Sequence, residues 1–121
     1  MNIRVKATNF ELTSETSDYL DDRIATLDKL LGSDAAVSRC EVEVGKDGGD
    51  QRHGDNVYFA EFHVLYPGGS ARATNHAANV RVAIDDAKEE LARQLRRSRK
   101  MHIRMWRKSG SAFKRFLRME D

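Results

Sequence analysis

The sequence contains one cysteine and one proline, and it has no long apolar run. A lone cysteine, Cys40, cannot close an internal disulfide, which fits a reducing compartment. Its place in an alternating apolar pattern favours a buried structural thiol over a nucleophile. No stretch approaches the roughly 20 apolar residues that a membrane span requires, and the first ten residues lack the apolar core of a signal peptide. We therefore expect a cytoplasmic protein without stable membrane association.

The motifs of catalysis and metal binding are also missing. The four histidines are scattered, with no paired spacing and no cysteine cluster that suits zinc. Three aspartates within residues 45–56 do not have the register of a calcium loop. The acidic pairs Asp85–Asp86 and Glu89–Glu90 lie in the first turns of a predicted helix, where the helix dipole stabilises acidic residues. We expect no catalytic residue, no metal, no cofactor and no small-molecule substrate.

Acidic residues are almost missing from the last quarter of the chain. Residues 1–90 contain 10 Lys/Arg and 17 Asp/Glu, whereas residues 91–121 contain 11 Lys/Arg and 2 Asp/Glu. Cations without partners repel one another, so this arrangement costs stability unless an external polyanion relieves it. Nucleic acid is the partner that this charge distribution favours. A basic tail that only aids solubility is the alternative.

The stretch from Asn79 to Lys108 predicts a long amphipathic helix. At about 100° per residue, one side of this helix carries an apolar stripe: Val80, Ile84, Ala87, Leu91 and Leu95. The opposite side carries a basic face: Arg93, Arg96, Arg97, Lys100, Arg104 and Arg107. A helix of this length would measure about 43 Å, which is more than a small domain is wide. We therefore expect its C-terminal half to extend beyond the core and to present positive charge.

The remaining sequence predicts the element order β-α-β-β-β-α. Alternating apolar and polar residues predict four strands: Asn2–Thr8, Val37–Val44, Val57–Tyr66 and Ser70–His76. The first helix is expected to begin at the N-cap Thr13 and to end at Gly32, and Gly45–Asn56 is expected to be a loop. The simplest arrangement is one α+β domain with a four-stranded sheet and both helices on one face.

The element order and the helix sequence AIDDAKEELARQLRRSRK, residues 83–100, resemble the ribosome hibernation-promoting factors and ribosome-associated inhibitors in their short form. Tyr19 and Arg23 stand where the family's first helix has a tyrosine and a basic residue. The resemblance covers about residues 1–100 and implies a fold like that of double-stranded-RNA-binding domains. It also implies a monomeric, non-enzymatic translation inhibitor, active in the stress response, that occupies the messenger and transfer RNA region of the small ribosomal subunit.

Carried over by position, the resemblance implies six RNA-facing residues: Arg23, Lys29, Lys88, Arg93, Arg96 and Arg97. The basic face adds Lys100, Arg104 and Arg107 to this set. The extension 101–121 does not resemble the tails of the family. Its aromatic residues stand among cations, which suits base stacking, an anionic membrane surface, or packing on the domain. Two other functions fit the same charges, a stand-alone double-stranded-RNA-binding protein or RNA chaperone, and a basic membrane-surface protein.

Overall fold

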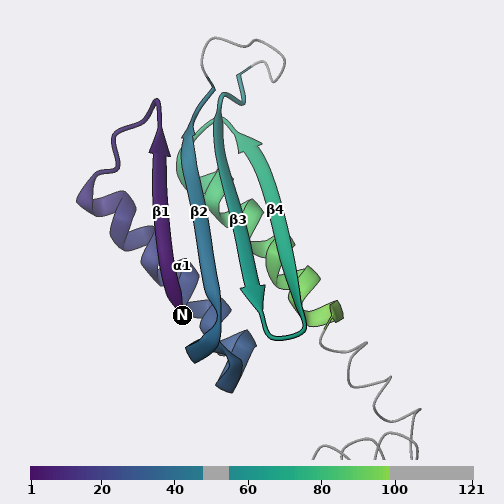
Figure 1. The fold of residues 1–121 in the computed structure, drawn as a ribbon. Helices are drawn as coiled ribbons and strands as arrows, with labels where there is room; N and C mark the ends of the chain where they lie inside the picture. Colours follow the sequence, from purple (N-terminus) through teal and green to yellow (C-terminus); the bar gives the residue numbers. More distant parts are fainter. Residues whose placement is uncertain (48–54, 99–121) are drawn as a thin grey trace, which may run out of the picture.

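A single four-stranded sheet with both helices behind it forms the fold (Figure 1). The computed structural model describes residues 1–47 and 55–98. In chain order the elements are β1 (Asn2–Thr8), α1 (Ser14–Leu31), the 3-10 helix η1 (Gly32–Val37), β2 (Arg39–Lys46), β3 (Tyr58–Tyr66), β4 (Gly69–Ala77) and a second helix, described over residues 80–98. The predicted α+β class and the order β-α-β-β-β-α are confirmed.

The strands lie in the order β1-β2-β3-β4. The first pair is parallel because α1 carries the chain back across the sheet, and the other two pairs are antiparallel. Each helix follows a strand of the same direction, so both helices run from the top to the bottom of Figure 1. The end of α1 and the last described turn of the second helix therefore lie at the same end of the domain.

Local sequence explains where α1 begins and ends. The Thr13 side chain accepts a hydrogen bond of 3.2 Å from the backbone N–H of Thr16, as an N-cap residue does. At the other end Gly32 has a φ of +59°, a left-handed conformation that glycine adopts without a side-chain clash. Between them, four side chains on one face are fully buried: Leu20, Ile24, Leu27 and Leu31.

The second helix confirms the predicted stripe. Ile84, Ala87, Leu91 and Leu95 are fully buried, and Val80 packs partly against the core. Asn79 acts as its N-cap, because its side-chain oxygen accepts a hydrogen bond of 2.9 Å from the N–H of Val82. The part of the predicted helix after residue 98 lies outside the described residues.

The core fills the space between the helices and one face of β2, β3 and β4. Its strand residues alternate along each strand: Cys40, Val42, Val44, Ala60, Phe62, Val64, Ala71, Ala73 and Ala77. The thiol of Cys40 is fully buried, and this burial raises its pKa to about 12. Cys40 is therefore the buried structural thiol that the sequence predicts.

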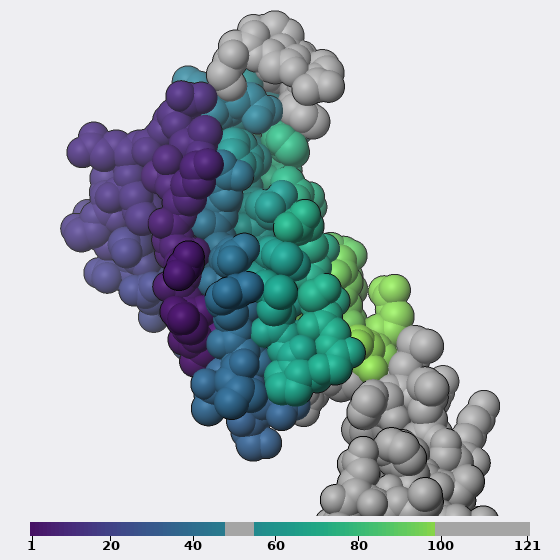
Figure 2. Space-filling view, viewed as in Figure 1, coloured from purple at the N-terminus to yellow at the C-terminus, as the bar shows by residue number. Residues whose placement is uncertain are grey.

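Two strands differ from their predicted form. Gly45 belongs to β2 and not to the loop, and a Cβ atom at this position would lie 2.2 Å from the Thr8 carbonyl oxygen, so only glycine fits beside β1. The alternation in β1 is typical of a half-buried strand, yet Ile3 and Val5 are 39% and 40% exposed. The cause is the edge position of β1, which leaves the outer side of each residue without a neighbouring strand. Figure 2 shows this strand open along its length at the margin of the sheet.

Candidate nucleic-acid interface

Exposed arginines gather toward the end of the described part of the second helix. Arg93, Arg96 and Arg97 all point to solvent on the side opposite the buried stripe. Arg93 is held by Glu90 through a hydrogen bond of 2.6 Å, which lowers the pKa of that carboxyl group. Within residues 1–47 and 55–98, neither Arg96 nor Arg97 forms a hydrogen bond or ion pair. Their guanidinium groups are therefore available for an external anion.

Lys88 lies one turn earlier on this helix and is more enclosed. Its ammonium group donates a hydrogen bond of 2.8 Å to Glu89, and its side chain is only 16% exposed. This bond is the main reason that the pKa of Glu89 is lowered. Lys88 is thus a predicted site residue whose charge is already compensated inside the domain.

Arg23 is compensated by a contact that joins the two helices. Its Nε donates a hydrogen bond of 2.8 Å to Asp85, and its Nη2 donates one of 3.1 Å to the Tyr19 hydroxyl. The Tyr19 hydroxyl donates a further bond of 2.5 Å to the other Asp85 oxygen. Arg23 also stacks 4.4 Å from the centre of the Tyr19 ring, and Arg81 lies 5.0 Å from it. Two arginines therefore flank one tyrosine where α1 meets the second helix.

The protonation of this cluster follows from its contacts. Burial by itself raises the pKa of Asp85, but the hydrogen bonds from Tyr19 and Arg23 outweigh it, and the pKa is lowered overall. Hydrogen bonds to Asp85 and Tyr19 raise the pKa of the Arg23 guanidinium. Both groups are charged at neutral pH, and they bind each other. Arg23 consequently holds the two helices together, and its charge is already paired with Asp85.

Lys29 is the remaining predicted site residue on α1. It is exposed in the last turn of the helix and has no ion pair among the described residues. Because both helices run in the same direction (Figure 1), Lys29 lies at the same end of the domain as Arg96 and Arg97. The structure therefore brings three cations that form no ion pair within the described residues to one end of the helical layer.

This basic character is local. The described residues contain 16 Asp/Glu and 12 Lys/Arg. Lys100, Arg104, Arg107 and the extension 101–121 lie outside the described residues, so their part in an interface stays a prediction. Sequence reasoning missed Arg81 and the role of Asp85. The spacing of Tyr19 and Arg23 by one helical turn was visible, but their shared partner is more than 60 residues away in the chain.

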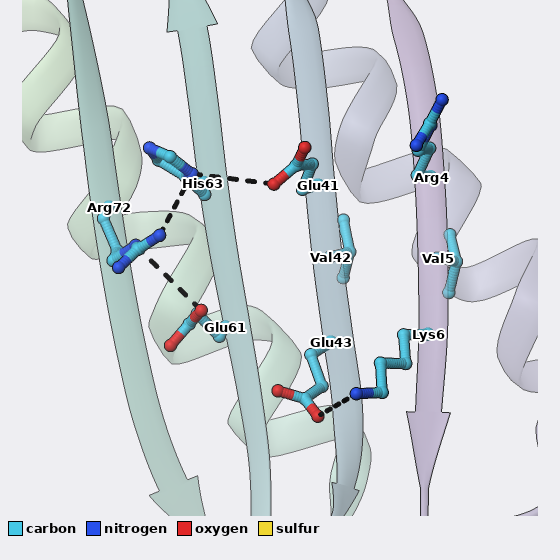
Figure 3. Close-up of a pocket in the computed structure, with 9 residues that line it drawn as sticks. All are labelled: Arg4, Val5, Lys6, Glu41, Val42, Glu43, Glu61, His63 and Arg72. Carbon is cyan, nitrogen blue, oxygen red and sulfur yellow. Dashed lines mark hydrogen bonds and ion pairs between the residues drawn. The ribbon is translucent and has the colours of Figure 1, made fainter.

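The sheet face opposite the helices has a shallow hollow of about 320 Å³ with mixed charge (Figure 3). Its cations largely pair with carboxylates from neighbouring strands: Lys6 with Glu43 at 3.9 Å, and Arg72 with Glu61 at 4.0 Å. His63 lies between, 3.2 Å from Arg72 and 3.8 Å from Glu41. This face offers a polyanion less free positive charge than the end of the helical layer does.

Neither a metal site nor a membrane helix is found in the described part of the chain. No group of three or more His, Cys, Asp or Glu residues within it could hold a metal ion. None of its helices is both long and apolar enough to cross a membrane. The arrangement of charges, rather than a cavity or a catalytic group, is the chemical feature of this surface.

Comparisons with known proteins agree with the architecture. The model of the family described as "Sigma 54 modulation protein / S30EA ribosomal protein" matches residues 3–102. A ribosome hibernation promotion factor of Deinococcus radiodurans is 29% identical over 98 residues, which cover 79% of this chain and 48% of that protein. The chain thus spans about half the length of this relative.

Two solved structures share the fold. The N-terminal domain of Protein Y from Thermus thermophilus has a TM-score of 0.65 and 28% identity, covering 80% of this chain and 98% of that one. A ribosomal subunit interface protein from Coxiella burnetii has a TM-score of 0.66, covering 83% of this chain and 99% of that one. Its identity is only 10%, so it supports the fold alone.

Proposed function

Since this chain belongs to the Sigma 54 modulation protein / S30EA ribosomal protein family, we propose that it is a ribosome-binding hibernation factor that inhibits translation. The relative from Deinococcus radiodurans is named for ribosome hibernation, and it matches 79% of this chain. One structural observation carries the proposal to particular residues. Arg96 and Arg97 are exposed on the second helix and have no ion partner among the described residues, as a phosphate-binding surface requires.

The proposed mechanism is occlusion of the small ribosomal subunit. The domain would fill the region where messenger and transfer RNA bind, so that transfer RNA cannot enter. Arginine and lysine contacts to ribosomal-RNA phosphates would supply affinity, and the shape of the cleft would select the site. Little base readout is expected, because phosphate contacts carry no sequence information.

Within this proposal the site residues have different roles. Arg96, Arg97 and Lys29 contact phosphates directly, since none of them forms an ion pair with a carboxylate of the described residues. Lys88 and Arg93 contribute after exchanging Glu89 and Glu90 for phosphate. Arg23 holds α1 against the second helix through Asp85. From their charge, we extend the interface to Lys100, Arg104 and Arg107.

The two parts of the chain have different proposed roles. Residues 1–100 form the ribosome-binding domain, and residues 101–121 form a basic extension that adds RNA contacts. The protein acts in the cytoplasm as a monomer, without catalysis and without a cofactor or small-molecule substrate. Its partner is the small ribosomal subunit.

The test is co-sedimentation of purified protein with small ribosomal subunits. Arg96→Glu combined with Arg97→Glu should weaken binding by at least about tenfold, because two phosphate contacts become repulsive. If about six phosphates are contacted, the slope of log affinity against log salt should be about −4 to −5. In the variant the slope should be shallower by the contribution of about two phosphate contacts. Both positions face solvent, so the melting temperature should not change.

A matched control changes the same amount of charge elsewhere. Arg4→Glu with Lys46→Glu alters two exposed residues of the sheet, and it should leave subunit binding within about twofold. Equal losses in both variants would mean that only net charge matters. An unchanged affinity in the arginine variant would refute the proposed interface. Tighter binding to naked duplex RNA or to anionic vesicles than to subunits would refute the ribosome as the partner.

A further inference from the structure

The two edges of the sheet differ in whether another group covers their backbone. At the β4 edge, the Gln94 side chain donates a hydrogen bond of 2.9 Å to the Arg72 carbonyl and accepts one of 3.2 Å from the Arg72 N–H. The amide of Gln94 thus occupies the two positions that a neighbouring strand would use. Covering an edge in this way prevents unwanted strand pairing.

The β1 edge has no such cover in the described part of the chain. The hydrogen bonds found along it lead inward, from Asn2 to Ser38, from Thr8 to Glu43 and from Asn9 to Lys46. All residues from Asn2 to Ala7 are exposed. In Figure 2 the strand is visible along its length at the edge of the sheet, and α1 lies beyond it. Alternate residues of this exposed stretch therefore present backbone N–H and C=O groups on the outer side of the strand.

The side chains of β1 form two rows of different chemistry. Ile3 and Val5 pair in register with Cys40 and Val42, so they lie on the helix side of the sheet, where they remain 39% and 40% exposed. Arg4 and Lys6 pair with Glu41 and Glu43 and lie on the open face seen in Figure 3. Arg4 has no ion pair among the described residues.

β2 shows which sequence is complementary to these rows. Along β2, acidic residues alternate with apolar ones, and they meet the cations and the apolar side chains of β1 respectively. A strand on the outer edge would meet the same two rows, because in-register neighbours in a sheet share a face. Such a strand would also cover the apolar surface that Ile3 and Val5 leave in water.

We propose that the outer edge of β1 is a docking site for an extended protein segment in which acidic and apolar residues alternate. Main-chain hydrogen bonds supply the affinity of such strand addition, and alternate side chains supply the specificity. A second copy of β1 is a poor occupant, since its own Arg4 and Lys6 would meet the same cations, and like charges opposite each other are destabilising. RNA would satisfy the cations but leave the apolar row exposed. This site is distinct from the proposed ribosome contacts, and its test requires no ribosome.

The probe is a nine-residue peptide of alternating glutamate and valine with blocked ends, titrated into the full chain with amide chemical shifts recorded. Shifts should concentrate on residues 2–8. A lysine–valine peptide of the same length should bind at least about tenfold more weakly, because its charges oppose Arg4 and Lys6. A glutamate–valine peptide with alternate backbone nitrogens methylated should lose binding, because strand addition needs its N–H groups.

Variants of the protein make the assignment specific. Arg4→Glu should reverse the preference between the two charged peptides, whereas Lys29→Glu, which makes the same charge change on α1, should preserve it. Arg4→Ala, which removes the charge without reversing it, should lower the affinity for the glutamate–valine peptide. It should not raise the affinity for the lysine–valine peptide. Each variant is checked by its melting curve. Shifts outside β1, or equal binding of both peptides, would overturn the proposal. So would concentration-dependent dimerisation that shifts the same amides without peptide.

Discussion

The two helices bury similar faces and expose different ones. Each lays an apolar stripe on the same side of the sheet, and four side chains in each stripe are fully buried. α1 contains five Asp/Glu and two Lys/Arg, and one of those cations, Arg23, forms an ion pair with the second helix. The second helix instead ends its described part with exposed arginines. The buried faces fix where the helices lie, and the outer faces decide what each can bind.

The difference arises from where the acidic residues stop. Side chains on a helix meet at spacings of three or four residues. Glu90 is the last acidic residue before the basic segment, and it pairs with Arg93 three positions later. Arg96 and Arg97 are beyond its direct reach. Spacing therefore leaves one of these three arginines in an ion pair and the other two without one among the described residues.

The largest effect should come from the shared inner faces. Leu91→Ala on the second helix and Leu27→Ala on α1 each remove a fully buried side chain, and each should lower the free energy of unfolding by about 2 to 5 kcal/mol. For a domain whose total stability is about 5 to 15 kcal/mol, either loss is large. Urea unfolding measures it. Subunit affinity per folded molecule should stay the same, and a much smaller loss at one site would show that the two stripes are not equivalent.

A second prediction concerns the cations of the extension 101–121, which lies outside the described residues. Stopping the chain after Lys100 removes six cations: Arg104, Arg107, Lys108, Lys114, Arg115 and Arg118. The remaining chain should fold, because the core lies within residues 20–95. Its affinity for small subunits should fall and depend less on salt, with the larger effect at low salt, as electrostatic contacts are lost. Unchanged affinity would confine the interface to residues 1–100, and loss of folding would make the extension structural.

Sequence periodicity predicted what depends on short-range geometry. The stripe of the second helix, the caps at Thr13 and Gly32, and the alternation of β3 all follow from residues that are close together in the sequence. The alternating pattern of β1 predicted the strand correctly, but it did not indicate that Ile3 and Val5 would be exposed. Exposure depends on whether a strand is central or at an edge, and alternation does not encode that position.

The candidate site was predictable only in part, for the same reason. The phase of the helix placed Arg96 and Arg97 on the outer side, and the structure agrees. The pairing of Arg23 with Asp85 joins residues 62 positions apart, so no local pattern could reveal it. From the sequence, Asp85 and Asp86 had the same interpretation, as acidic residues near the start of a helix. The structure separates them, because Asp85 contacts Arg23 and Tyr19.

The smallest effect tests this link between the helices. Asp85→Asn should lower the free energy of unfolding at pH 7 by about 1 kcal/mol, less than a buried charged hydrogen bond would, because solvent screens a partly exposed pair. The Asp85 side chain is 43% exposed. Contacts lower the folded-state pKa of Asp85, so its stabilisation is complete above the unfolded value of about 3.9 and is lost as the pH falls through the folded value. Wild type and variant should therefore converge in urea unfolding below about pH 3.9.

Asp86→Asn is the matched control, since Asp86 is exposed one position later on the same helix and has no ion pair among the described residues. Both substitutions remove one negative charge near the helix N-terminus, so the helix dipole contributes to both. Only Asp85→Asn also removes the charged acceptor of Arg23 and Tyr19. A greater loss for Asp85→Asn that disappears in acid would assign the difference to this bridge. Equal losses would mean that the dipole accounts for both residues and that Arg23 is free to bind RNA, which would make the outer faces of the two helices more alike.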